Sequence, residues 1–369
     1  MRIGVDVGPL AVRTGGIPRY VEKLVASLSG LECGHDFVLC GAIDPALAPP
    51  AVRPLAWDGR RVPLARWAKQ LHPIGAGSLD LFHATNYLPP LLARVPTVLT
   101  VHDLSVHLFP ESHGWPRRLR HRLLPAMCRR AARVIADSLN TKRDLVRHYG
   151  LPDERIDVVY LAAGQEFTPV SDEAARSHAR LRYRLPERFV LYVGSLDPRK
   201  NLVALIHAHA RLRRAGCPLP LVLGGVGAPR HVERLRAEAL AHGLVPGETL
   251  LLPGHVEDAD LPALYSQCEL FVYPSLYEGF GLPPLEAMAC GAPVLVPDNS
   301  AFSELYRGTR LLFDLDDPAA LTEAMAAALG DRARRQQIAE EGRKRAGARS
   351  WEDVAAETVA CFERALETG

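Results

Sequence analysis

Short, continuous apolar runs recur along the first half of the chain, separated by segments with helical or loop-like patterns. Runs without polar alternation are typical of strands buried on both faces of a parallel sheet. The segment Tyr20–Leu28 has apolar residues at helical spacing, and Thr141–Tyr149 follows the candidate N-caps Ser138 and Asn140. This alternation of strand and helix predicts a parallel sheet covered by helices. The predicted strands are Arg2–Val7, Phe37–Cys40, Leu81–His83, Thr97–Val101, Val134–Ala136 and Ile156–Leu161.

The pattern restarts at Phe189 and predicts a second doubly wound unit. Helical segments such as Leu202–Arg214 and Arg230–His242 separate its apolar runs. The polar stretch Gly164–Pro186 between the two units is the best candidate for a linker. The predicted strands of this second unit are Phe189–Val193, Leu219–Leu223, Leu250–Leu252, Leu270–Tyr273, Pro293–Val296 and Leu311–Phe313.

We therefore predict an α/β protein of two doubly wound domains, residues 1–165 and 166–350, with a cleft between them. A chain of 369 residues also exceeds the size at which one hydrophobic core usually stops growing. The last helix, Trp351–Leu366, is amphipathic, and we expect residues 351–369 to pack back on the first domain. Ligands of open parallel sheets bind at the carboxyl ends of the strands, so the chemistry is expected in the cleft.

The composition is that of an ordinary globular protein, because 48% hydrophobic and 23% charged residues argue against disorder. A net charge of +2 gives no sign of nucleic-acid binding. The seven cysteines are scattered without C-x-x-C spacing, which indicates reduced thiols and no zinc site. Apolar runs are too short for a membrane span, and Met1–Gly8 has no signal-peptide pattern. We expect a cytoplasmic protein whose mature chain begins at Met1.

The segment Ser275–Gly291 carries the most information about chemistry. It follows an apolar strand and leads into a helix that Pro283 and Pro284 open, since proline favours the first helical turn. A helix N-terminus attracts phosphate, and Glu278 and Glu286 bracket this anion site. Such an acid can accept hydrogen bonds from sugar hydroxyls. The loop residues that offer backbone N–H groups are Gly279, Phe280, Gly281 and Leu282.

The spacing from Glu278 to Glu286 resembles the E-x7-E motif of retaining family-4 glycosyltransferases, and the similarity extends over nearly the whole chain. The resemblance implies a GT-B fold of two Rossmann-like domains that transfers a sugar from a nucleotide diphosphate with retention. It also implies that Glu278 contacts the donor sugar and that Glu286 holds the ribose hydroxyls. Backbone contacts to the base would fall on His255 and Val256, after a predicted strand.

A basic pair, Arg199 and Lys200, follows the strand in VGSLDPRKNL at Val193–Leu202. The resemblance implies that this pair neutralises the donor diphosphate. The leaving nucleotide gains charge as the glycosidic bond breaks, so fixed cations stabilise the transition state. The alternative is an ordinary surface turn that precedes a helix.

Two features of the first domain fit the same chemistry. Gly15 and Gly16 lie between a strand and a helix, where backbone amides can approach a diphosphate. His102 and Asp103 follow the strand Thr97–Val101, which places the histidine at a strand end that should face the cleft. The resemblance implies that His102 contacts the donor sugar near the reaction centre, whereas a lone histidine is otherwise usually structural. Asp103 is a candidate for a supporting or acceptor contact.

Other sequence patterns and other classes of protein were compared with this prediction. Asp314–Asp316 matches a metal-binding D-x-D pattern, but Asp317 and Pro318 read as a helix start, so we expect no metal ligands and no cofactor. A glycosidase needs two carboxylates that flank a scissile bond. The anion loop between Glu278 and Glu286 fits a nucleotide donor better. A sugar-nucleotide epimerase and a non-enzymatic binding module stay open as alternatives.

The donor and acceptor are predicted from the resemblance alone. The PRKNL pattern and the first strand make GDP-mannose the first expectation, ahead of UDP-sugars and dTDP-rhamnose. The acceptor is expected to be a glycan, a lipid-linked glycan in surface polysaccharide synthesis, or a small molecule. The arginine-rich segment Trp115–Val134 reads either as a basic amphipathic helix on the inner face of an anionic membrane or as a solvated helix packed on its sheet.

Overall fold

The computed structural model describes residues 1–11, 15–41, 53–54, 79–87 and 95–367. The chain divides into two compact units, Met1–Leu161 with Arg349–Gly369, and Ala162–Ala348. The sequence predicted a division at residue 165 and a C-terminal helix, residues 351–369, that packs back on the first domain. None of the described helices is both long and apolar enough to cross a membrane.

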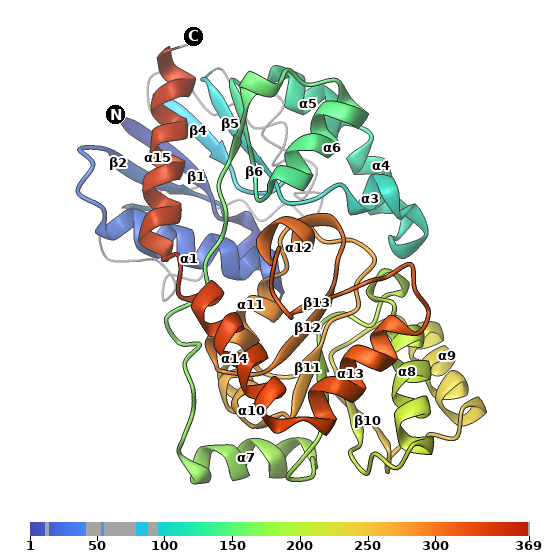
Figure 1. Ribbon diagram of the computed structural model, residues 1–369. Helices are drawn as coiled ribbons and strands as arrows, with labels where there is room; N and C mark the ends of the chain where they lie inside the picture. Colours follow the sequence, from blue (N-terminus) through green and yellow to red (C-terminus); the bar gives the residue numbers. More distant parts are fainter. Residues whose placement is uncertain (12–14, 42–52, 55–78, 88–94, 368–369) are drawn as a thin grey trace. The chain divides into compact units, whose positions relative to one another are not determined.

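The described residues of the first unit form a parallel sheet of seven strands, in the order β3-β2-β1-β4-β5-β6-β7. Figure 1 labels β1, β2, β4, β5 and β6. The central strands β4 and β5 are buried along their whole length, which explains their unbroken apolar runs. The two-residue edge strand β3 was not predicted. The strands are β1 Arg2–Asp6, β2 Asp36–Cys40, β3 Arg53–Pro54, β4 Leu81–Ala84, β5 Thr97–Val101, β6 Arg133–Ala136 and β7 Ile156–Val158.

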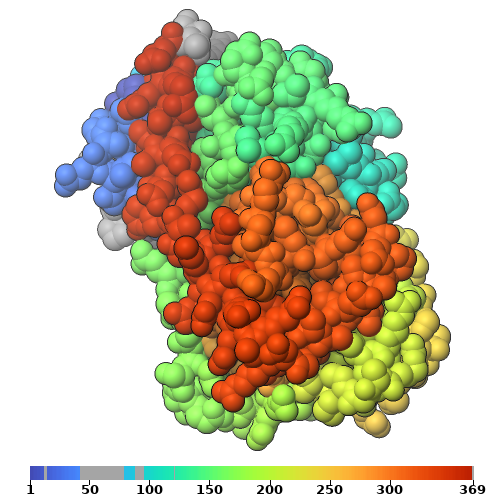
Figure 2. Space-filling model, viewed as in Figure 1, coloured from blue at the N-terminus to red at the C-terminus, as the bar shows by residue number. Residues whose placement is uncertain are grey.

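Helices cover this sheet, and the last helix of the chain is among them. The helix α15, Trp351–Glu367, packs against α1, β5 and β6 through an apolar stripe that includes Val354, Cys361 and Phe362. Figure 2 shows it lying along the surface of the unit beside the N-terminal segment. The other helices are α1 Gly16–Gly30, α3 Ser105–Leu108, α4 Trp115–His121, α5 Leu124–Arg130 and α6 Leu139–Tyr149.

The arginine-rich segment is not one amphipathic helix. It forms two short helices, α4 and α5, and its last residues enter β6. Pro125 lies in the first turn of α5, where proline is tolerated but cannot donate the hydrogen bond that would continue α4. The expectation of one continuous helix was therefore wrong.

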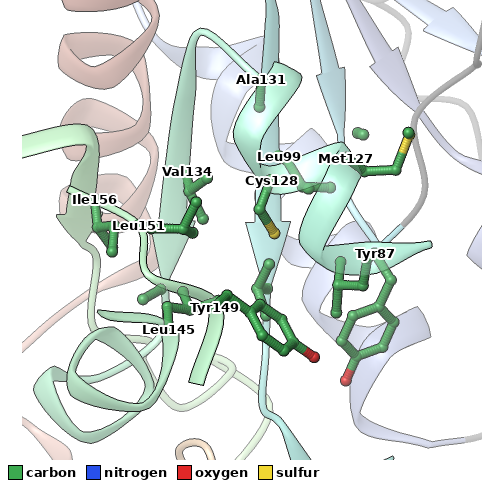
Figure 3. Close-up of a cluster of buried hydrophobic side chains, with 14 of the residues drawn as sticks. Tyr87, Leu99, Met127, Cys128, Ala131, Val134, Leu145, Tyr149, Leu151 and Ile156 are labelled. Carbon is green, nitrogen blue, oxygen red and sulfur yellow. The ribbon is translucent and has the colours of Figure 1, made fainter. Parts of the chain in front are cut away.

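One hydrophobic cluster of the first unit lies between the β4–β6 strands and the helices α5 and α6 (Figure 3). Leu99 and Val134 come from neighbouring strands, while Cys128 and Leu145 come from the covering helices. Burial raises the pKa of the Cys128 thiol to about 12, so this cysteine is a protonated core residue, as the scattered cysteine pattern predicts.

The second unit repeats the plan with six parallel strands in the order β10-β9-β8-β11-β12-β13. The strands are β8 Val190–Val193, β9 Leu221–Gly224, β10 Leu250–Gly254, β11 Leu270–Val272, β12 Val294–Pro297 and β13 Leu312–Phe313. The helices are α7 Glu173–Tyr183, α8 Leu202–Arg214, α9 Pro229–Ala241, α10 Leu261–Gln267, α11 Leu282–Ala289, α12 Ser300–Leu305, α13 Ala320–Gly330 and α14 Arg332–Ala346.

The segment predicted as a linker, residues 164–186, is an ordered part of the second unit. Asp172 caps α7 by accepting a hydrogen bond from the Ala174 N–H. Arg180 donates from Nη1 to Gln267 Oε1 of α10 at 2.9 Å, and Val170 N–H donates to Ser266 Oγ. The polar composition of the segment reflects these surface hydrogen bonds, so the linker assignment was wrong.

Both sheets reverse their strand order beside their first strand, at β1–β4 in one unit and at β8–β11 in the other. In doubly wound sheets, ligands bind outside the carboxyl ends of the strands at such a switch point. The predicted α/β class with two doubly wound domains is confirmed. The cleft expected between the domains stays a prediction.

Candidate active site

Two buried cations follow β8 at the switch point of the second unit. A single 3-10 turn, Pro198–Lys200, carries Arg199 and Lys200, and both side chains are buried. Asn201 ends the turn at a φ of 54°, and α8 begins at the next residue. The burial of both side chains excludes the alternative of an ordinary surface turn. Lysine and arginine are almost never fully buried unless they are paired.

Glu278 is the partner of both cations. Lys200 Nζ lies 2.5 Å and Arg199 Nη1 lies 3.1 Å from Glu278 Oε1. Burial by itself would raise the pKa of Glu278, but Arg199 and Lys200 outweigh it and lower that pKa. The carboxylate is ionised at neutral pH, so this cationic cluster of one acid and two bases carries a net positive charge.

Tyr273, the last residue of the predicted strand Leu270–Tyr273, contacts the cluster. Lys200 Nζ donates to Tyr273 Oη at 2.8 Å, and the Tyr273 ring stacks on Tyr192 with centroids 5.3 Å apart. The backbone N–H of Glu278 donates to Ser300 Oγ at 3.1 Å. The lysine ammonium and the glutamate therefore have fixed positions at the carboxyl ends of β8 and β11.

The loop after Glu278 turns into α11 through a glycine that cannot be replaced without strain. Gly281 is the N-cap of α11 with a φ of 94°, and a Cβ built there would lie 2.4 Å from Phe302 Cε1. Pro283 and Pro284 have no N–H, so the backbone donors nearest this helix end belong to Phe280, Gly281 and Leu282. The side chains of Phe280 and Leu282 are buried.

Glu286 lies in the second turn of α11. Helix α11 begins at Leu282 without an acidic residue in its first turn, which places Glu286 in the second turn. Its side chain is almost fully buried, and its charge contributes to raising the pKa of the neighbouring Cys290, after burial of that thiol. The expected role in binding ribose hydroxyls stays a prediction.

Val256 lies just beyond β10, as expected, and its side chain is buried. Its Cγ2 would lie 3.1 Å from a Cβ built at Gly224, so it packs against the end of β9. The predicted contact between the Val256 backbone and a nucleotide base stays a prediction.

His102 directly follows β5 in the first unit and is buried between two acceptors. Its Nδ1 lies 2.7 Å from Asp137 Oδ2, and its Nε2 lies 2.9 Å from the carbonyl oxygen of Thr85. Because a carbonyl oxygen accepts and does not donate, Nε2 carries a proton, and a proton on Nδ1 completes the bond to the carboxylate. Burial lowers the pKa of His102, but Asp137 outweighs it and raises that pKa. Burial also raises the pKa of Asp137, although His102 opposes that rise. Below the raised pKa of His102, the pair is an imidazolium and a carboxylate.

Asp137 was not predicted as a site residue, although it directly follows β6 as His102 directly follows β5. A polar residue directly after a buried apolar strand was the signal that singled out His102, and the same signal applies to Asp137. Only the pairing of β5 with β6 brings the two side chains together.

Gly15 and Asp103 have local structural roles. Gly15 is the N-cap of α1 with a φ of 114°, a conformation that favours glycine, and Gly16 is the first residue of that helix. Asp103 Oδ1 accepts from the Ser105 N–H and from Tyr87 Oη. Arg13, beside the glycines, lies outside the described residues. The structure thus joins Arg199, Lys200 and Glu278 in one cluster, and places His102 and the glycines in the other unit.

The D-x-D segment forms turns. Asp314 Oδ1 accepts from the Asp316 N–H at 2.9 Å, and Asp317 Oδ1 accepts from the Ala319 N–H at 2.8 Å. Helix α13 begins only at Ala320, so the predicted helix start at Pro318 was too early by about half a turn.

Known proteins similar to this chain include several sugar transferases. O-antigen chain mannosyltransferase B of Escherichia coli is 31% identical over 287 residues, which cover 77% of this chain and 74% of that protein. The serotype-specific mannosyltransferase WbdA of Escherichia coli is also 31% identical, over 78% of this chain. This chain spans only 36% of the length of WbdA.

Solved structures share the fold over the whole chain. Sucrose-phosphate synthase from Thermosynechococcus elongatus has a TM-score of 0.76 at 24% identity and covers 100% of both chains. Anabaena HepE in complex with UDP and glucose has a TM-score of 0.74 at 21% identity and covers 98% of this chain and 99% of HepE.

Two family models match consecutive parts of the sequence. Residues 14–163 match the model described as Glycosyltransferase Family 4, and residues 174–345 match the model described as Glycosyl transferases group 1. Together with the mannosyltransferase relatives and the shared fold, these matches show that the chain belongs to the family-4 type of GT-B glycosyltransferases.

Proposed function

We propose that this protein transfers a sugar from a nucleoside diphosphate donor to a glycan acceptor. The observation that carries the proposal is the buried cluster of Arg199, Lys200 and Glu278 at the switch point of the second unit. Its net positive charge suits a diphosphate, and its position beside the α11 N-terminus adds backbone donors. The family membership and the mannosyltransferase relatives support the same reaction class.

Each residue of the cluster has a proposed part in the transfer. Arg199 and Lys200 bind the diphosphate and stabilise the charge that grows on it as the glycosidic bond breaks. Glu278 accepts hydrogen bonds from the donor sugar, and Glu286 binds the ribose hydroxyls. His102, as an imidazolium, contacts the sugar, while Gly15 and Gly16 bring backbone amides to the diphosphate. Arg199 and Lys200 supply the positive charge that a divalent ion would otherwise supply, so the reaction needs no metal and no cofactor.

We propose GDP-mannose as the donor and retention of the anomeric configuration. The relatives in Escherichia coli are mannosyltransferases, which supports mannose. The alternative substrates are a UDP- or dTDP-sugar as the donor and a small molecule as the acceptor. A sugar-nucleotide epimerase is the alternative reaction, and it would isomerise the donor without consuming an acceptor.

The test is a transfer assay with GDP-mannose, UDP-glucose, UDP-N-acetylglucosamine and dTDP-rhamnose, in the presence of a chelator. Release of GDP from GDP-mannose alone, with an α-linked product by NMR, is the expected result. We expect Lys200→Ala to lower kcat by about 100-fold or more, and Lys344→Ala, an exposed lysine of the same unit, to leave it unchanged. Full activity in Lys200→Ala would contradict the assignment, and an isomerised donor would identify an epimerase.

We further propose that the acceptor is lipid-linked and that the protein works at the cytoplasmic face of a membrane. The surface of α4 and its C-terminal end supports this proposal, because Trp115 is 71% exposed and Leu119 and Leu123 are also exposed beside exposed arginines. Aromatic and apolar side chains among arginines suit an anionic lipid surface. The exposed arginines are Arg117, Arg118 and Arg122.

Co-sedimentation with vesicles tests the membrane contact. Vesicles rich in anionic lipid are expected to bind the protein, and neutral vesicles are not. The double variant Trp115→Ser/Arg118→Glu should lose binding, whereas Arg230→Glu on α9 of the other unit should keep it. Equal binding of wild type and double variant would exclude this surface.

A further inference from the structure

Two histidines and a glutamate meet on the outer helices of the second unit, away from the cationic cluster. His207 lies on α8, Glu238 on α9, and His242 directly after α9. The two helices pack side by side (Figure 1). Glu238 and His242 are four residues apart, which places them on one helix face, and His207 approaches that face from the neighbouring helix.

The ligand atoms of the three side chains converge. His207 Nε2 lies 3.0 Å and His242 Nε2 lies 4.0 Å from the same oxygen, Glu238 Oε2. All three ligand atoms lie within 4.8 Å of one another. Ligands about 2.1 Å from a zinc ion lie about 3.4 Å apart in a tetrahedron, so side-chain rotations suffice to close the site.

The chemistry of this donor set selects a class of ion. Two imidazoles and one carboxylate suit zinc and its first-row neighbours, whereas magnesium and calcium prefer oxygen ligands only. The side chains are between 30% and 38% exposed, so an ion can reach them from solvent and keep a water as its fourth ligand.

We propose that His207, Glu238 and His242 form a binding site for a divalent transition-metal ion, with zinc as the ion of choice. The ion joins α8 to the end of α9. Because α8 begins directly after Lys200 and Asn201, this clamp stabilises the helix that follows the cationic turn. The site lies outside the reacting groups, and its role is structural.

Metal binding is measured on full-length protein that has been treated with a chelator and desalted. Zinc is titrated in competition with a chromogenic chelator, and cobalt is titrated while the visible spectrum is recorded. We expect one ion per chain and the intense visible absorption of four-coordinate cobalt. Thermal unfolding should shift upward with zinc, because the ion binds the folded state preferentially.

Three variants and one control decide the site. His207→Ala, Glu238→Gln and His242→Ala should each weaken zinc affinity by at least tenfold and abolish the thermal shift. His178→Ala, an exposed histidine on α7, should bind zinc as wild type does. Circular dichroism of the metal-free variants separates loss of ligands from loss of folding, and Glu238→Gln preserves side-chain size. Zinc binding that is absent in wild type, or unchanged in all three variants, would overturn the proposal.

Discussion

At the scale of single residues, the buried charge of Glu278 is decisive for both binding and stability. Removing one partner of a buried ion pair leaves the other charges uncompensated and costs about 3–5 kcal/mol. We predict that Glu278→Gln, which removes the carboxylate that Arg199 and Lys200 share, lowers the free energy of unfolding in urea at pH 7 by about that amount. Glu233→Gln, at an exposed surface pair, should change it by less than about 0.5 kcal/mol.

The lowered pKa of Glu278 predicts that the free energy of unfolding decreases at acid pH. The folded pKa of Glu278 is lowered, so its contribution is present above the unfolded value of about 4.3 and is lost as the pH falls through the folded pKa. Wild type and Glu278→Gln should therefore converge in urea stability when the pH falls below about 4. A constant difference between them down to pH 3 would contradict the assignment.

The pair of His102 and Asp137 has the opposite pH dependence. The folded pKa of His102 is raised, so its contribution is complete below about pH 6.5 and is lost as the pH rises through the folded pKa. We predict that Asp137→Asn loses about 3 kcal/mol of unfolding free energy at pH 6 and less at high pH. NMR titration of the imidazole should show a lower pKa in the variant, and exposed Asp36→Asn is the control.

At the scale of elements, the turn into α11 depends on one glycine. Gly281→Ala combines the left-handed backbone, which costs about 1–2 kcal/mol, with a clash against Phe302. We predict reduced thermal stability and at least tenfold weaker binding of a nucleoside diphosphate by calorimetry. Gly330→Ala, where nothing lies near the built Cβ, should alter neither property, and Phe302→Leu should partly rescue Gly281→Ala.

At the scale of the whole molecule, the chain returns to its first unit after completing the second. The fully buried Phe362 of α15 packs against the ring of His83 on β4, with centroids 5.1 Å apart. We predict that the fragment 162–348 folds cooperatively by itself, because it contains its own sheet and helices. The fragment 1–161 should require residues 349–369, supplied as a peptide, for cooperative thermal unfolding. Cooperative unfolding of 1–161 alone would show that α15 is dispensable.

The sequence by itself determined the class of fold and the position of most strands. Buried parallel strands must be apolar on both faces, so β5 and β8 are visible as local runs. The spacing of Glu278 and Glu286 and the position of Arg199 are likewise local, and they pointed to a sugar-nucleotide site. The edge strand β3 and the break between α4 and α5 carry weak local signals, because short elements owe their form to their neighbours.

Only the tertiary structure decided which distant residues meet. Lys200 and Glu278 are 78 positions apart, and His102 and Asp137 are 35 apart. Their contacts depend on which strands are neighbours in each sheet, and strand order is set by packing and chain connection, not by local propensity. The same holds for His207 and Glu238, which meet because α8 packs on α9. It also holds for α15, whose apolar stripe is buried because the helix packs on the first unit.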